Sequence, residues 1–150
     1  FARGLGTGIG PVVVRACFKD EATWPSLIGY LIALSGIFYF LVGISVSNAL
    51  WITVVLVVFA HSASGANWVL STVLVQQWVE DEVRGRVFSA DMLILSVAFS
   101  ASTTIAGYLT EYTELGIQYG ILLFSGVMIV SGIFFSLWKT DAPDRVQAVA

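Results

Sequence analysis

The chain has 150 residues, of which 57% are hydrophobic and only 11% are charged, and its mean hydropathy is +0.88. Charged residues make up roughly 25% of a typical soluble domain, so this composition indicates a membrane protein. The net charge of −3 argues against a nucleic-acid surface, because phosphate binding needs clustered lysine and arginine. The single cysteine, Cys17, cannot form an intramolecular disulfide or a multi-cysteine metal site. We therefore expect no cofactor and no metal.

Charges and turn residues divide the chain into apolar segments, and a membrane-spanning helix needs about 20 such residues. No Asp, Glu, Lys or Arg occurs from residue 22 to residue 79, so this run must cross a bilayer more than once. It breaks at residues 45–48, where serine and asparagine favour a turn. The sequence predicts an all-α, polytopic membrane protein. Its helices are expected at residues 1–16, 26–46, 49–79, 87–110 and 116–138, followed by a tail at 139–150.

The first segment begins with glycines on alternate positions, in Phe-Ala-Arg-Gly-Leu-Gly-Thr-Gly-Ile-Gly-Pro. It is apolar from Phe1 onward and has no basic n-region, so we expect the chain to start inside a helix and to be a fragment. A dinucleotide fingerprint is excluded because Ile9 stands where its third glycine should be, and the lysine of a P-loop is missing. The spacing instead gives two small-xxx-small pairs, which allow close helix packing. The glycines predicted to pack are Gly4, Gly6, Gly8, Gly10, Gly29, Gly36, Gly43 and Gly107.

The basic residues indicate the orientation of the chain in the membrane. Apart from Arg3, every lysine and arginine lies within or beside residues 17–25, residues 80–86 or the tail. The alternate connections, 45–48 and 111–115, contain none. Because cytoplasmic loops carry an excess of lysine and arginine, we expect the basic side and the C-terminus to be cytoplasmic.

Ionisable residues inside a bilayer are costly, so each is a functional candidate. Arg3 lies twelve residues before Arg15, about 18 Å along a helix, which predicts a position near the midplane. It could hold an anionic substrate, pair with a carboxylate, or be purely structural. Asp91 is expected in the first turn or so of its helix, about 7 Å from Arg86. It could cap the helix, carry a proton, or act as a latch that pairs with a nearby arginine.

The third segment carries polar side chains on one broad helical face. His61 and Ser71 lie on this face, and Asn67 lies at its edge. We expect Asn67 near the midplane and His61 nearer the outer border, so that the face lines a cavity. A lone histidine without further ligands at metal-binding spacing is more often a packed residue than a metal site.

One short motif resembles a known family. Residues 79–86 read Val-Glu-Asp-Glu-Val-Arg-Gly-Arg, which is similar to the V-P-D-E-L-R-G-R loop after the tenth helix of major facilitator superfamily transporters, in the bacterial branch that includes enterobactin exporters. Arg84, Gly85 and Arg86 match, while Glu80 and Val83 replace the proline and the leucine. Residues 3–11 resemble the eighth helix of that family, and residues 105–107 the end of its eleventh. The resemblance covers the chain as helices eight to twelve, within the C-terminal six-helix half.

The resemblance implies a secondary active transporter in the bacterial inner membrane, which exports a small molecule by alternating access and is driven by a gradient, most simply of protons. It also implies a missing N-terminal half of the same chain as partner, and a gating role for the loop at Arg84, Gly85 and Arg86, which could otherwise be a solvated turn. No chemistry on the substrate is implied. The alternatives are a small membrane scaffold or subunit without transport, and an intramembrane enzyme. The enzyme has little support, because a Ser/His/Asp set, an H-E-x-x-H motif and paired intramembrane carboxylates are all missing from the sequence.

Overall fold

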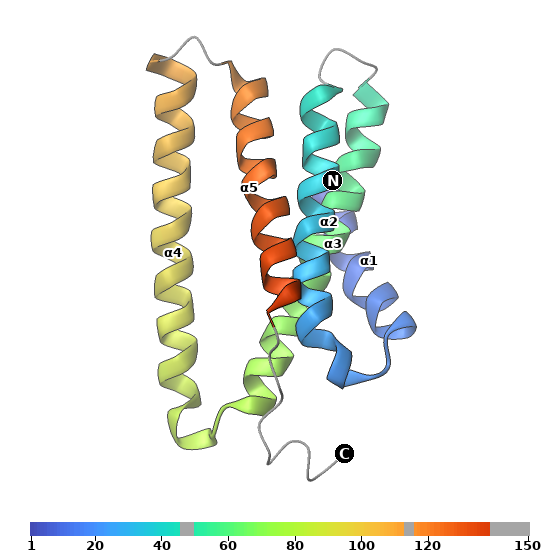
Figure 1. Ribbon diagram of the computed structural model, residues 1–150, viewed down its shortest axis with the longest axis vertical. Coiled ribbons are helices and arrows are strands. Elements are labelled where there is room, and N and C mark those ends of the chain that lie inside the picture. Colours follow the sequence, from blue (N-terminus) through green and yellow to red (C-terminus); the bar gives the residue numbers. More distant parts are fainter. Residues whose placement is uncertain (46–49, 113–115, 139–150) are drawn as a thin grey trace.

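A computed structural model of the chain describes residues 1–45, 50–112 and 116–138, and these residues form helices without any strand (Figure 1). The all-α prediction is therefore confirmed. The predicted tail 139–150, the turn residues 46–48 and residues 113–115 lie outside the described residues. The elements are α1 (Ala2–Cys17), the short 3-10 helix η1 (Glu21–Thr23), α2 (Trp24–Ile44), α3 (Leu50–Trp78), α4 (Asp81–Tyr112) and α5 (Ile117–Leu137).

Four stretches of the described chain are long and apolar enough to cross a membrane: Glu21–Ile44, Leu50–Trp78, Asp81–Tyr112 and Ile117–Leu137. They correspond to the last four predicted segments, so the prediction of a multi-pass membrane protein is confirmed. The end of the bundle that holds η1 and the junction between α3 and α4 is called the charged end below, because the basic residues Arg15, Lys19, Arg84 and Arg86 gather near it.

The largest difference from the sequence prediction is the start of α4. The helix begins at Asp81, so residues 84–86 lie in its first turns and the predicted loop at 80–86 is wrong. The physical reason is the pair of acidic residues in the first turn, Asp81 and Glu82, because the helix dipole stabilises negative charge there. Arg84 adds an ion pair to Asp81 one turn away and donates a hydrogen bond to the Val79 carbonyl at 3.1 Å.

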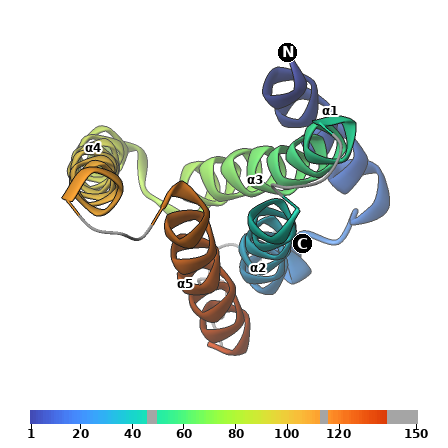
Figure 2. The ribbon, with the colours of Figure 1, turned by 90° about the horizontal axis from the view of Figure 1, so that it is seen from above.

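Helix α2 lies in the middle of the bundle and packs against both α3 and α5, while α1 packs against α3 (Figure 2). Large residues of α2, such as Trp24 and Leu31, meet small and branched residues of α3, such as Ala66 and Leu70, in the largest apolar cluster. Inside this contact the Ser35 hydroxyl donates a hydrogen bond to the Ala60 carbonyl of α3 at 3.0 Å. Helix α4 stands at the edge beside α5, and none of its residues is buried (Figure 2).

Glycines set the closest approach of α1 to α3. A Cβ atom at Gly6 or Gly10 would collide with the backbone of α3 between Val58 and Ser62, so these positions admit no larger residue without a shift. The Gly6/Gly10 pair therefore packs as predicted. The pair Gly4/Gly8 does not: no described atom lies within 4 Å of a Cβ placed at either residue. Successive glycines of this series are two residues apart and so point in nearly opposite directions around a helix, which lets only one pair face α3.

The glycines predicted to pack in α2 all face α5. Gly29 lies against the backbone of Gly132 and Ser136, and Gly36 and Gly43 lie against side chains further along α5. These three predictions are confirmed. Gly107 of α4 has no described atom within 4 Å of its Cβ position, so the packing predicted for it is not found in the described part of the chain.

Candidate functional site

Two polar side chains from different helices meet inside the bundle. The Tyr39 hydroxyl of α2 lies 2.7 Å from Nε2 of His61 in α3, and the two rings pack edge to face with their centroids 5.8 Å apart. A Cβ atom placed at Gly6 of α1, one turn after Arg3, would lie 3.0 Å from Cβ of His61. The predicted candidate His61 thus pairs with Tyr39, while Arg3 lies about one turn away along α1. Sequence reasoning missed Tyr39, because a tyrosine in an apolar helix carries no periodic or motif signal.

The contacts of α1 with α3 show where Arg3 lies along the bundle. A Cβ atom at Gly6 would collide with the Val58 carbonyl oxygen, and one at Gly10 would collide with the Ser62 carbonyl. Arg3 lies about one turn before Gly6, on the N-terminal side of these contacts. Its position near the membrane midplane stays a prediction.

His61 and Asn67 lie three residues on either side of Ser64, the middle residue of α3. Asn67 is partly buried, and its Oδ1 atom has no hydrogen-bond partner among the described residues. Leaving a buried acceptor unpaired costs about 1–3 kcal/mol, so this oxygen would gain from a hydrogen-bond donor that a rearrangement of the helices brings to it. The Ser71 hydroxyl, in contrast, already donates to the Trp68 carbonyl at 3.0 Å.

Asp91 differs most from its predicted environment. It follows Asp81, the first residue of α4, by ten positions, or about 15 Å along the helix. The capping interpretation is therefore wrong, because the dipole acts only within the first turn. The side chain is exposed, and no ion pair to Asp91 occurs among the described residues, since Arg84 pairs with Asp81 instead.

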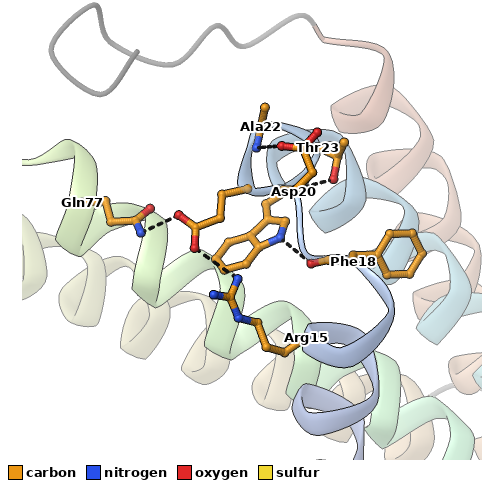
Figure 3. A network of polar contacts seen from close by, with 8 residues as sticks. Arg15, Phe18, Asp20, Ala22, Thr23 and Gln77 are labelled. Carbon is orange, nitrogen blue, oxygen red and sulfur yellow. Dashed lines mark hydrogen bonds and ion pairs between the residues drawn. The ribbon is translucent and has the colours of Figure 1, made fainter. Parts of the chain in front are cut away.

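A network at the charged end ties together three helices and was missed by the sequence analysis (Figure 3). The Glu21 carboxylate binds the Arg15 guanidinium at 3.1 Å and accepts a hydrogen bond from Gln77 of α3 at 2.9 Å. The Arg15 guanidinium also lies over the Trp24 ring, 4.8 Å from its centroid, and the Trp24 indole donates to the Phe18 carbonyl at 3.1 Å. Since Arg15 and Glu21 are about half exposed, the ion pair contributes at most about 1 kcal/mol. The network mainly fixes the direction of the connection between α1 and α2.

The described residues contain no group of three or more His, Cys, Asp or Glu side chains that could hold a metal ion. The polar groups found here are instead single side chains spread over α1, α3 and α4. They can form hydrogen bonds and ion pairs with a ligand, but those on α4 do not meet those on α1 and α3 within the described residues.

Comparison with known proteins identifies the family. The sequence model of the Major Facilitator Superfamily matches residues 22–149, which include all of α2, α3, α4 and α5. No curated protein and no solved structure is significantly similar to the chain. Since the family match covers most of the sequence, the chain belongs to the Major Facilitator Superfamily of membrane transporters.

Proposed function

We propose that this chain is the C-terminal part, helices eight to twelve, of an exporter in the bacterial inner membrane. The protein moves a small molecule outward by alternating access and is driven by protons, with the C-terminus in the cytoplasm. The observation that carries the proposal is the family match over residues 22–149. The resemblance of residues 79–86 to the loop of enterobactin-type exporters supports the export branch.

The exposure of α4 supports a missing partner half. This helix has 32 residues, none of which is buried, and it carries Asp91 together with a shallow groove lined by Ser96, Ser100 and Thr104. A carboxylate facing lipid is unfavourable, and ionisable residues in spanning helices almost always face other helices or water. The N-terminal half of the same chain would cover this face and close a central cavity.

We assign the candidate residues to two roles, substrate binding and proton coupling. Asp91 lies roughly 8 Å from the middle of α4, and an ionisable residue at such a position in a spanning helix is a functional candidate, so we assign it to proton coupling. Four polar side chains supply donors and acceptors for the substrate: Arg3, His61, Asn67 and Ser71. The unpaired oxygen of Asn67 is buried here, so it would meet the substrate only when the helices move during the transport cycle.

The gate is assigned to the charged end. Arg84, Gly85 and Arg86 lie in the first turns of α4, where Arg84 is bound to Asp81. In the proposed cycle Arg84 exchanges Asp81 for a partner on the other half as the cytoplasmic side opens and closes. Gly85 leaves room for that approach, because no described atom lies within 4 Å of its Cβ position.

The proposal is tested with the full-length protein in cells that lack their own exporters. Cells are loaded with Hoechst 33342 or with a catecholate siderophore, and loss of each compound is followed with and without a protonophore. We expect protonophore-sensitive loss of at least one compound, and we expect Asp91→Asn to abolish its dependence on external pH. The matched control is Glu111→Gln, which changes the exposed carboxylate at the other end of α4.

Two results would contradict the proposal. Efflux of every compound that continues unchanged in the presence of protonophore would exclude proton drive. Asp91→Asn with the same pH dependence as Glu111→Gln would remove Asp91 from the coupling role while leaving the transporter assignment in place.

A further inference from the structure

A cavity of about 310 Å³ lies between α2, α4 and α5, apart from the candidate residues on α1 and α3. Its volume falls at the lower end of the range of about 300–1,000 Å³ that is typical of small-molecule sites. It is lined by Tyr39 of α2, by Ala106 and Thr110 of α4, and by Gly120, Phe124 and Met128 of α5 among others. The walls therefore consist of two aromatic rings, a thioether, the side chains of Ile117 and Ile121, and small residues.

The hydroxyl groups around this cavity already take part in hydrogen bonds. The Tyr39 hydroxyl is hydrogen-bonded to His61, and the Thr110 hydroxyl donates to the carbonyls of Ala106 and Gly107, each at 3.0 Å. Ser125, the third hydroxyl in the wall, donates to the Leu122 carbonyl at 2.9 Å. No charged residue is among those lining the cavity. A charged ligand would find no ion-pair partner there and would lose its hydration.

We propose that this cavity binds a compact, neutral aromatic molecule that enters from the bilayer. The Tyr39 and Phe124 rings offer aromatic contacts, and Met128 offers a polarisable sulfur, which packs well against aromatic rings. His61 acts as a positioning residue, because its hydrogen bond and edge-to-face contact fix the Tyr39 ring in the wall. The site touches the proposed transport route only through the Tyr39–His61 hydrogen bond, and it does not depend on which substrate is carried.

Two glycines of α5 provide a matched pair of variants. Gly120 lines the cavity, whereas Gly126 lies outside it, in a shallow groove on another part of α5. Neither has a described atom within 4 Å of its Cβ position, so a side chain can start at each without a backbone collision. Gly120→Leu should fill the cavity, and Gly126→Leu should change only the outer surface. Ala106→Leu fills the same cavity from α4 and checks that the effect belongs to the space rather than to one helix.

The test is photolabelling of the full-length protein in proteoliposomes with benzophenone, a neutral aromatic ketone that inserts into nearby C–H bonds on irradiation. We expect saturable labelling that peptide mapping places on the segment holding Phe124 and Met128. Naphthalene should compete with this labelling. Gly120→Leu and Ala106→Leu should each weaken it about tenfold or more, a loss of about 1.4 kcal/mol in binding, while Gly126→Leu retains it.

Other outcomes would overturn the inference. Labelling that does not saturate, or that is equal in Gly120→Leu and Gly126→Leu, would mean simple partition into lipid. Competition by hexadecane but not by naphthalene would assign the cavity to a lipid acyl chain. Because labelling requires no transport, its failure leaves the proposed transport function untouched, and efflux measured on the same variants reports on that function separately.

Discussion

The contact between α2 and α5 at Gly29 gives a prediction whose size follows from the structure. A Cβ atom at Gly29 would lie 2.5 Å from the Ser136 amide nitrogen and 2.7 Å from the Gly132 carbonyl oxygen. Both are backbone atoms of a helix and cannot rotate away, so Gly29→Ala must push the two helices apart. Overpacking of this kind costs about 1–3 kcal/mol, and we expect that loss in the free energy of unfolding.

The same contact can be tested from the other side. A Cβ at Gly132 would meet the backbone of Ala33 and would lie 2.7 Å from the Gly29 carbonyl oxygen. Gly132→Ala should therefore be destabilised by a similar amount. Since one separation of α2 from α5 relieves both collisions, the double variant should lose less than the sum of the two single variants, with a coupling of about 0.5–3 kcal/mol.

The measurement is the free energy of unfolding of the full-length protein in mixed micelles, from titration with sodium dodecyl sulfate. The control is Gly126→Ala, also on α5, where no described atom lies within 4 Å of the Cβ position. The free energy of unfolding of that variant should equal that of the parent protein or exceed it by up to about 1 kcal/mol, because glycine inside a helix is itself unfavourable. Equal stability of Gly29→Ala and Gly126→Ala would refute the reasoning.

Three further variants test other contacts. Ser35→Ala loses the hydrogen bond to Ala60 and should lower the free energy of unfolding by about 0.5–1.5 kcal/mol. Ser62→Ala loses only a hydrogen bond to its own helix, so it should have a smaller effect in the same titration. Asn67→Leu removes the unpaired amide and should leave stability equal or higher while reducing efflux; unchanged efflux would remove Asn67 from the substrate site. Arg84→Ala should slow efflux without loss of helix content by circular dichroism, and an unchanged rate would mean that this arginine has no gating role.

The helical architecture could be predicted from the sequence, because hydropathy, turn residues and charged residues all indicate the same division of the chain into helices. The four long helices were predicted in the right order, and the packing of Gly29, Gly36 and Gly43 followed from their spacing. The start of α4 was not found, because charged residues were assigned to a loop although acidic residues also favour a helix N-terminus.

The candidate site was harder to predict from the sequence, because it depends on which helices pack together. Spacing within α3 placed His61 and Asn67 on the helix, but only the crossing of α2 over α3 brings Tyr39 to His61. The glycine repeat of α1 allowed two packing faces, and the sequence did not distinguish Gly6/Gly10 from Gly4/Gly8. Glu21 was missed because its partners, Arg15 and Gln77, come from separate helices.

The central claim is that a proton gradient drives this protein, and an imposed gradient tests it most directly. Full-length protein is reconstituted into liposomes, a pH difference is set by dilution, and accumulation of the compound exported in cells is recorded. We predict accumulation that requires the pH difference, reverses when the difference is reversed, and disappears with a protonophore. Accumulation at the same rate without any pH difference would contradict it.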